Sequence, residues 1–396
     1  MAAERRVYLD NTATTAVLPE VVDTVLPYLR EVYGNPQSWH LWGDGAREAV
    51  ETAREQVGKL INANPEEIIF TASGTEANNL AIKGLAQAQA SKGRHIVVSA
   101  IEHFSVLHAT RTLEKSGYEV TLVPVDKYAL VDPDEVARNI RKDTILVSVM
   151  HANGEVGTIQ PIADIARKVK EAGVLFHTDA VASTGNIPVD VKALGVDALS
   201  LAGSQFYGPK GSAALWVRKG LRLIPLMDGG VQEGGRRPGT EDVPGIVGLG
   251  KAAELAARDM ASRAGQFTKL RDKLIDGLLD KVSHAILTGH QVQRLPHHAS
   301  FCIEFIEGEA MLMLLSSQGI AVSSGSACTS RALKASHVLI AMGLPHEIAQ
   351  GSLVFGLGLD TSQGDIDYVL EKLPPIVDRL RQMSPLYAKF VKEGRG

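Results

Sequence analysis

Cysteine is scarce in this sequence. Only two cysteines, Cys302 and Cys328, occur in 396 residues, which excludes a framework of disulfide bonds. The sequence contains no CxxC pair and no cluster of histidine and cysteine, so we expect no metal site built by this chain alone. Each cysteine therefore has to be considered as a single thiol.

The sequence also lacks an excess of charge of one sign and a long apolar run. Its 41 basic and 45 acidic side chains leave a net charge of −4, which gives no electrostatic reason to bind nucleic acid or an anionic membrane. No segment approaches the ~20 apolar residues that a membrane-spanning helix needs. The first residues, MAAERRVYLDNTATT, contain no apolar signal core. We therefore expect a cytoplasmic protein with no nucleic-acid or membrane partner.

Hydrophobic periodicity indicates an α/β fold. Between about residues 45 and 225, amphipathic segments such as AREAVETAREQVGKLI alternate with apolar runs such as EEIIFTAS, RHIVVSA and TILVSVMHA. Strands and helices at this spacing predict a mainly parallel central sheet with helices on both faces. Such sheets bind ligands beyond the carboxyl ends of their strands. From about residue 262, long helical patterns with few strands predict a small α+β domain.

Candidate site residues follow several of the predicted strands. In FTASGTEANN, Gly74 and Thr75 would begin a helix, where free N–H groups favour a phosphate; a simple N-cap turn is the alternative. His103 in SAIEHFSV and Asp179 in FHTDA each follow or end a strand. A carboxylate there can pair with a protonated pyridine nitrogen. The alternatives are a structural histidine and an aspartate that caps the next helix.

The two cysteines have different surroundings. Cys328 lies in SSGSACTSR, a small and polar segment typical of an exposed loop, whereas Cys302 in HASFCIEF fits a buried strand. An exposed thiol can carry a transferable sulfur atom. The following segment, LKASHVLIAMGL, is predicted to form a helix whose N-terminus would favour the thiolate. Cys328 is therefore the candidate reactive group, with an inert inherited cysteine as the alternative.

In this order, the motifs resemble the cysteine desulfurases of iron–sulfur cluster assembly, within the class V aminotransferase group of fold-type-I pyridoxal-phosphate enzymes. The resemblance covers nearly the whole chain and is carried by VYLDNTATT, FTASGTEANNLAI, IEHFSV, HANGEVGTIQPI, HTDAVAS, YGPKGSAALWVRKG, GGVQEGGRRPGTEDVPG and SSGSACTSRALKASHVLIAMGL. It implies a fold-type-I large domain over residues 15–260, a small α+β domain over 1–14 and 261–396, and a homodimer.

The resemblance also implies roles for single residues. Gly74 and Thr75 match the phosphate-binding positions. His103 matches the acid–base group that stacks on the cofactor ring, and Asp179 matches the partner of its pyridine nitrogen. Thr240 in RRPGTED matches the residue that reaches the phosphate across the dimer interface.

The pattern departs from the family at the centre of the expected site. Gln205 stands at the Schiff-base lysine position, and an amide cannot form an imine with an aldehyde. Further departures remove expected contacts to the cofactor or to the substrate carboxylate: Ser204, Ala202, Ala182, Gly154, Val354 and Leu359. We therefore predict that pyridoxal 5'-phosphate binds weakly or not at all, and not covalently.

Three explanations of Gln205 compete. An introduced substitution would leave its neighbours intact, which is not the pattern found. Lys210 in the nearby Gly-Pro-Lys-Gly turn could replace the missing lysine, but that turn belongs to the ordinary family pattern. Natural loss of the cofactor chemistry accounts for all the departures, and we favour it.

Three functional hypotheses follow. The first is a desulfurase-like protein that lacks the Schiff-base lysine and acts in sulfur handling or iron–sulfur cluster assembly through Cys328. That thiol would carry a persulfide, or would be one ligand of an iron–sulfur cluster shared with a scaffold or sulfur-acceptor protein. The second is an active pyridoxal-phosphate cysteine desulfurase, and the third is a non-catalytic binding subunit. We favour the first because the SSGSACTSR loop is intact.

Overall fold

A seven-stranded sheet forms the centre of the larger part of the molecule. The computed structural model describes residues 5–325 and 335–394 of the chain. The strand order is β2 (Ile68–Thr71), β8 (Ala213–Val217), β7 (Ala198–Ala202), β6 (Leu175–Asp179), β5 (Thr144–Ser148), β3 (His95–Ser99) and β4 (Glu119–Val123). β8 runs antiparallel to both of its neighbours, and the other neighbouring pairs are parallel. The sheet is therefore mainly parallel, as predicted.

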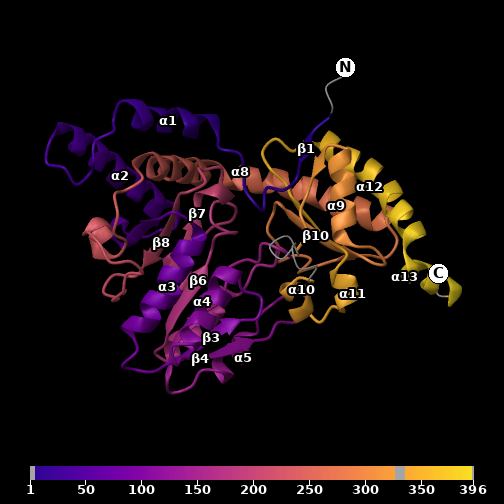
Figure 1. Cartoon of the computed structure of the whole chain (residues 1–396), viewed down its shortest axis with the longest axis horizontal. Helices are drawn as coiled ribbons and strands as arrows, with labels where there is room; N and C mark the ends of the chain where they lie inside the picture. The colour runs from indigo at the N-terminus through magenta and orange to yellow at the C-terminus, as the bar shows by residue number, and fades with distance from the viewer. Residues whose placement is uncertain (1–4, 326–334, 395–396) are drawn as a thin grey trace.

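Helices cover both faces of this sheet (Figure 1). They are α1 (Pro19–Arg30), α2 (Leu41–Leu60), α3 (Gly74–Ala88), α4 (Phe104–Glu114), α5 (Pro133–Arg138), α6 (Ile162–Glu171) and α7 (Val191–Leu194). On one face, Val97 and Phe176 share a core with side chains of α2 and α6. On the other, Ile96 and Leu146 share a core with side chains of α3 and α4. Neighbouring residues of one strand thus enter opposite cores, as the alternation of side chains along a strand requires.

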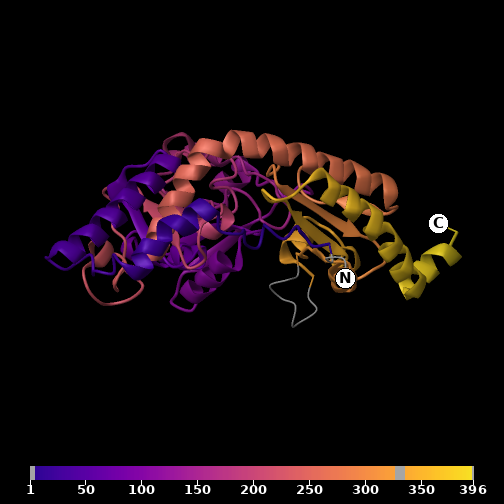
Figure 2. The same cartoon turned by 90° about the horizontal axis from the view of Figure 1, so that it is seen from above.

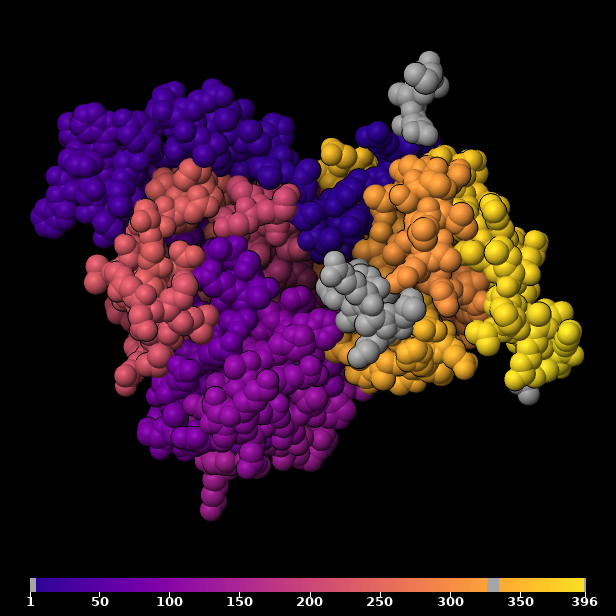
Figure 3. Space-filling view, viewed as in Figure 1, coloured from indigo at the N-terminus to yellow at the C-terminus, as the bar shows by residue number. Residues whose placement is uncertain are grey.

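The C-terminal part builds a second core with the N-terminal strand. A three-stranded antiparallel sheet contains β12 (Ser352–Gly356), β10 (His298–Ile303) and β9 (Ala285–Leu287), and β1 (Val7–Tyr8) pairs in parallel with β11 (Ile320–Ala321). The helices of this part are α9 (Gly308–Ser317), α10 (His337–Ala341), α11 (His346–Ala349), α12 (Gln363–Met383) and α13 (Pro385–Lys392). Figure 3 shows this part, in orange and yellow, beside the larger one.

One long helix, α8 (Val243–Lys281), runs along both parts (Figure 2). Its first half contributes residues such as Ile246 to a core of the central sheet, and its second half contributes residues such as Leu274 to the C-terminal core. The predicted domain boundary after residue 260 falls inside this helix. Gly265 lies between the two halves, is exposed, and an added Cβ would meet no described atom within 4 Å apart from its chain neighbours and the nearby backbone of α8. No helix of the described ranges is long and apolar enough to cross a membrane.

Candidate functional site

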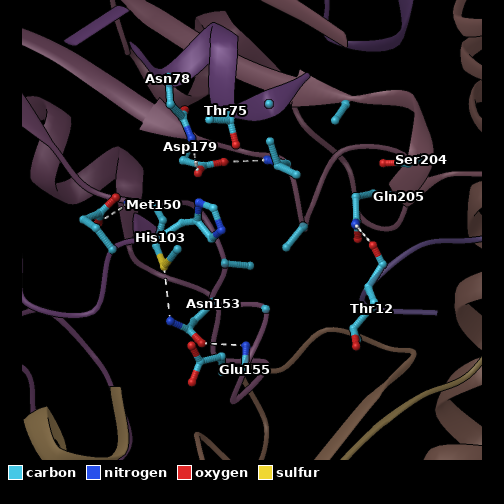
Figure 4. Close-up of a pocket in the computed structure, with 18 of the residues that line it drawn as sticks. Thr12, Thr75, Asn78, His103, Met150, Asn153, Glu155, Asp179, Ser204 and Gln205 are labelled. Carbon is cyan, nitrogen blue, oxygen red and sulfur yellow. Dashed lines mark hydrogen bonds between the residues drawn. The ribbon is translucent and has the colours of Figure 1, made fainter. Parts of the chain in front are cut away.

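A cavity of about 440 Å³ lies where several strands of the central sheet end. The start of α3, the end of β6 and the turn after β7 line one part of it. Residues 150 and 152–155 line another part, and residues 323–325 with Val354 close it from the C-terminal part. Figure 4 shows that Thr75, Asn78 and Asp179 lie together, with Gln205 and Thr12 across the cavity from them. The predicted residues Gly74, Thr75, His103, Asp179, Ser204 and Gln205 all line this one cavity.

Asp179 is held in place by two donors. It is the last residue of β6 and is buried at 4% exposure. Asn78 Nδ2 donates to Asp179 Oδ2 at 2.6 Å, and the Val181 N–H donates to Oδ1 at 3.0 Å. Burial raises the pKa of Asp179, and the hydrogen bond from Val181 and the charge of His103 oppose this rise. Asp179 therefore makes a local turn contact rather than a helix cap, and it lies in the cavity wall.

His103 is connected to Asp179 through two side chains. It is the N-cap of α4, where its Nδ1 accepts from the Ser105 N–H at 3.1 Å. Ser105 Oγ lies 2.7 Å from the same Nδ1, and Asn78 Nδ2 donates to Ser105 Oγ at 2.8 Å. Because Nδ1 accepts, the neutral imidazole carries its proton on Nε2. Neither Asn78 nor Ser105 was predicted as a site residue, although Asn78 lies inside the FTASGTEANN motif.

The N-terminus of α3 borders the same cavity. α3 begins at Gly74, and Ser73 Oγ accepts from the Glu76 N–H as an N-cap. An added Cβ on Gly74 would come within 2.6 Å of Val181 Cγ2, so this close approach of two chain segments requires glycine. Thr75 is exposed and lines the cavity. The N-cap turn that was the alternative interpretation is present, and the N-terminus of α3 still faces the cavity.

Gln205 occupies the opposite wall. It ends a short 3₁₀ turn, Gly203–Gln205, and its Nε2 donates to the Ala13 carbonyl oxygen at 3.2 Å. Lys210 is exposed and is not among the residues that line the cavity. Within the described ranges, no lysine or arginine lines this cavity.

Two glutamates that were not predicted as site residues, Glu102 and Glu155, lie in the cavity wall. Glu102 is fully buried; its Oε1 accepts from Ser99 Oγ and from the Met150 N–H at 2.8 Å, and its Oε2 has no hydrogen-bond partner among the described residues. Burial raises the pKa of Glu102 to about 8. Burial also raises the pKa of Glu155 to about 7, and Ser336 Oγ donates to its carboxylate. No sequence signal separates these carboxyls from surface ones, because their effect depends on burial.

We expect a Glu102→Gln variant to remove a pH-dependent loss of stability. Between the ordinary pKa of about 4.5 and the folded value of about 8, the folded protein keeps a proton that the unfolded chain releases. The wild-type free energy of unfolding therefore falls as pH rises through this window. The difference in free energy of unfolding between the variant and wild type should grow in the variant's favour by about 1.4 kcal/mol per pH unit. Urea unfolding at pH 5.5, 6.5 and 7.5 measures this difference. Glu114 is exposed, so the control variant Glu114→Gln should show the same pH dependence of the free energy of unfolding as wild type. The same pH dependence in Glu102→Gln as in wild type would contradict the expectation.

The remaining predicted residues lie outside the cavity or outside the described ranges. Cys302 is fully buried on β10, and burial raises the pKa of its thiol to about 12, so it fits the predicted core cysteine. Thr240 is exposed and does not line the cavity of its own chain. Cys328 and its predicted metal role lie outside the described residues. Among the residues that are described, no group of three or more histidine, cysteine or acidic side chains could hold a metal ion.

Comparisons with known proteins show the family to which the chain belongs. The family model described as aminotransferase class-V matches residues 7–369. The chain is 51% identical over 385 residues to the cysteine desulfurase IscS of Methanosarcina thermophila, covering 97% of this chain and 95% of that protein. The chain belongs to the cysteine desulfurases of the class-V aminotransferase family. A second cysteine desulfurase IscS, of Dictyoglomus turgidum, is 48% identical over 382 residues, covering 96% of this chain and 97% of that protein.

Solved structures of desulfurase relatives share the fold. A NifS-like protein matches with a TM-score of 0.90 and 39% identity, covering 95% of this chain and 100% of the other. The NifS-like protein from Rickettsia africae matches with a TM-score of 0.86 and 31% identity, covering 94% of this chain and 100% of the other. These matches confirm the predicted fold-type-I class.

The cavity of this desulfurase-family chain fits part of pyridoxal 5'-phosphate, the cofactor expected in the family. Asp179 suits the protonated ring nitrogen, and the N-terminus of α3 suits the phosphate. Asn78 Oδ1 is buried and has no hydrogen-bond partner in the described structure, which leaves an acceptor for a ligand beside Asp179. The aldehyde end does not fit covalent attachment, because no described lysine lines the cavity.

Proposed function

We propose that this desulfurase-family protein handles sulfur for iron–sulfur cluster assembly through Cys328, without a covalently attached cofactor. One observation supports the proposal: Gly74, Thr75, His103 and Asp179 line one cavity, and Gln205 but no lysine of the described chain lines it with them. The names of the relatives, cysteine desulfurase IscS, support a role in sulfur mobilisation.

The chemistry left to Cys328 requires a donor that already holds sulfane sulfur. A thiolate attacks the outer sulfur of a donor persulfide, a new S–S bond forms on Cys328, and the donor leaves as a thiolate. Electrons balance in this exchange, so neither an oxidant nor carbon–sulfur cleavage is needed. A bound pyridoxal ring supplies an electron sink for cleavage of substrate bonds, and this exchange does not use it. An iron–sulfur scaffold or another thiol protein would then accept the sulfur.

We expect borohydride reduction of the purified protein, followed by mass spectrometry, to show no pyridoxyl-lysine. Gln205 cannot attach the aldehyde, and the exposed Lys210 does not line the cavity. The Gln205→Lys variant is the matched control for detecting attachment. It should still gain little cysteine desulfurase activity, because the buried Val354 offers no cation for the substrate carboxylate. A pyridoxyl-lysine in the wild-type protein would support the active-desulfurase alternative.

A homodimer completes the proposal. Thr240 is exposed and does not line its own chain's cavity, which suits a residue that serves the neighbouring subunit. Gly239 and Glu241 border a small surface pocket of about 90 Å³ beside it. We expect a dimer in light scattering at micromolar concentration, and a monomer there would contradict the assignment of Thr240.

A further inference from the structure

The cavity presents an unusual distribution of donors and charges around the position where a cofactor aldehyde would lie. Three acids, Glu102, Glu155 and Asp179, belong to its wall, and among the described residues that line it only His103 could carry a positive charge. Burial raises the pKa of all three carboxyls, and of the side chains that line the cavity only His103 opposes this rise by its charge, at Asp179. A ligand that brings its own positive charge would stabilise the ionised forms of these carboxyls and would be stabilised by them in turn.

The amide of Gln205 has a defined orientation. Its Nε2 donates to the Ala13 carbonyl oxygen, so a flipped amide would place two oxygens against each other. The amide oxygen Oε1 consequently remains as an acceptor, and no hydrogen bond to it is found in the described part of the chain. A cofactor group at this position therefore binds most favourably when it donates a hydrogen bond to Oε1.

The aldehyde and amine forms of the vitamin B6 phosphates differ at this position. An aldehyde oxygen only accepts hydrogen bonds, so it cannot satisfy Gln205 Oε1. An aminomethyl group is an ammonium at neutral pH, donates hydrogen bonds, and supplies the positive charge that the wall lacks. The two forms share the ring nitrogen and the phosphate, so Asp179, Asn78 and the start of α3 serve both equally.

We propose that this cavity binds the amine form, pyridoxamine 5'-phosphate, non-covalently and in preference to pyridoxal 5'-phosphate. Gln205 is the residue that sets the preference. The buried, unpartnered Asn78 Oδ1 and the Asp179 carboxylate hold the ring end, and Gly74 and Thr75 face the phosphate. Glutamine at position 205 thus changes which form of the cofactor the cavity prefers, rather than only weakening the binding of the aldehyde form.

Equilibrium dialysis of the full-length protein with three ligands tests this preference. Pyridoxamine 5'-phosphate should bind at least about tenfold more tightly than pyridoxal 5'-phosphate, since a charge-assisted hydrogen bond is gained. Pyridoxine 5'-phosphate, whose hydroxyl donates without charge, should lie between them. Inorganic phosphate measures the contribution of the helix N-terminus alone.

Two substitutions of Gln205 make the test specific. The isosteric Gln205→Glu should widen the preference for the amine form, because it adds a negative charge beside the ammonium. Gln205→Lys should reverse it, and Lys210→Ala, away from the cavity, should leave it unchanged. Circular dichroism of each variant confirms that it is folded.

Three results would overturn the proposal. The first is that wild type binds the aldehyde form as tightly as the amine form or more tightly. The second is that none of the three ligands binds more tightly than inorganic phosphate. The third is a preference that neither Gln205 variant changes. The preference does not depend on sulfur transfer, so it should persist in Cys328→Ser. A failure here therefore differs from a failure of the proposed function, in which sulfur transfer survives the loss of the thiol.

Discussion

Sulfur transfer to an acceptor protein is expected to fall at least about a hundredfold when Cys328 is replaced by serine. A thiolate is the nucleophile in exchange with a persulfide, and a serine hydroxyl remains protonated and forms no S–S bond. Transfer of labelled sulfur from a persulfide donor to a candidate iron–sulfur scaffold protein measures the effect. Serine is nearly isosteric with cysteine, so the melting temperature should change little.

Cys302→Ala is the matched control for this result. Cys302 is fully buried on β10, and the pKa of its thiol is raised to about 12, so it cannot act as an accessible thiolate. This variant should transfer sulfur at the wild-type rate once its folding is confirmed. If Cys328→Ser transfers sulfur as well as Cys302→Ala does, the sulfur-handling function is wrong and the binding-subunit hypothesis replaces it.

The second large effect is expected on stability, from Glu233→Gln. Arg54 Nη1 and Nη2 each donate to the carboxylate of Glu233 at 2.8 Å, and the Phe70 N–H donates to it at 2.9 Å. Both side chains of the ion pair are nearly inaccessible, at 10% and 3% exposure. The neutral amide leaves the Arg54 charge buried without its main partner, which typically costs about 3–5 kcal/mol. Urea unfolding measures the change in the free energy of unfolding.

Glu66→Gln provides the comparison for a surface ion pair. Glu66 Oε1 lies 2.6 Å from Lys219 Nζ, and both side chains are mostly exposed, at 60% and 75%. Its loss should cost less than about 1 kcal/mol because water screens the pair. Similar costs for the two variants would show that the Arg54–Glu233 pair contributes no more than a surface contact.

The fold and half of the site could be predicted because both depend on local patterns. Alternating strands and helices gave the mainly parallel sheet, and the strand-end positions brought Gly74, Thr75, His103 and Asp179 to one cavity. The ends of parallel strands meet at one edge of a sheet, so motifs that follow them converge whatever their separation along the chain.

The other half of the site depends on burial and on contacts between distant segments. Glu102 differs from a surface glutamate only because the folded chain excludes water from it. Ser105 connects Asn78 to His103 only after α3 and α4 have packed side by side. The length of α8 was not predicted either, because its two halves pack on different cores that form only in the folded chain.

The continuity of α8 restricts how the cavity can change its width. A flexible linker would let the two parts sample many orientations, and each bound ligand would then have to reduce that conformational entropy. A single helix fixed to both cores removes most of these orientations before any ligand arrives. We expect any bending of α8 to concentrate at Gly265, because glycine has low helix propensity and few described atoms surround this position. We therefore expect the two parts to keep nearly the same relative orientation with and without a bound ligand.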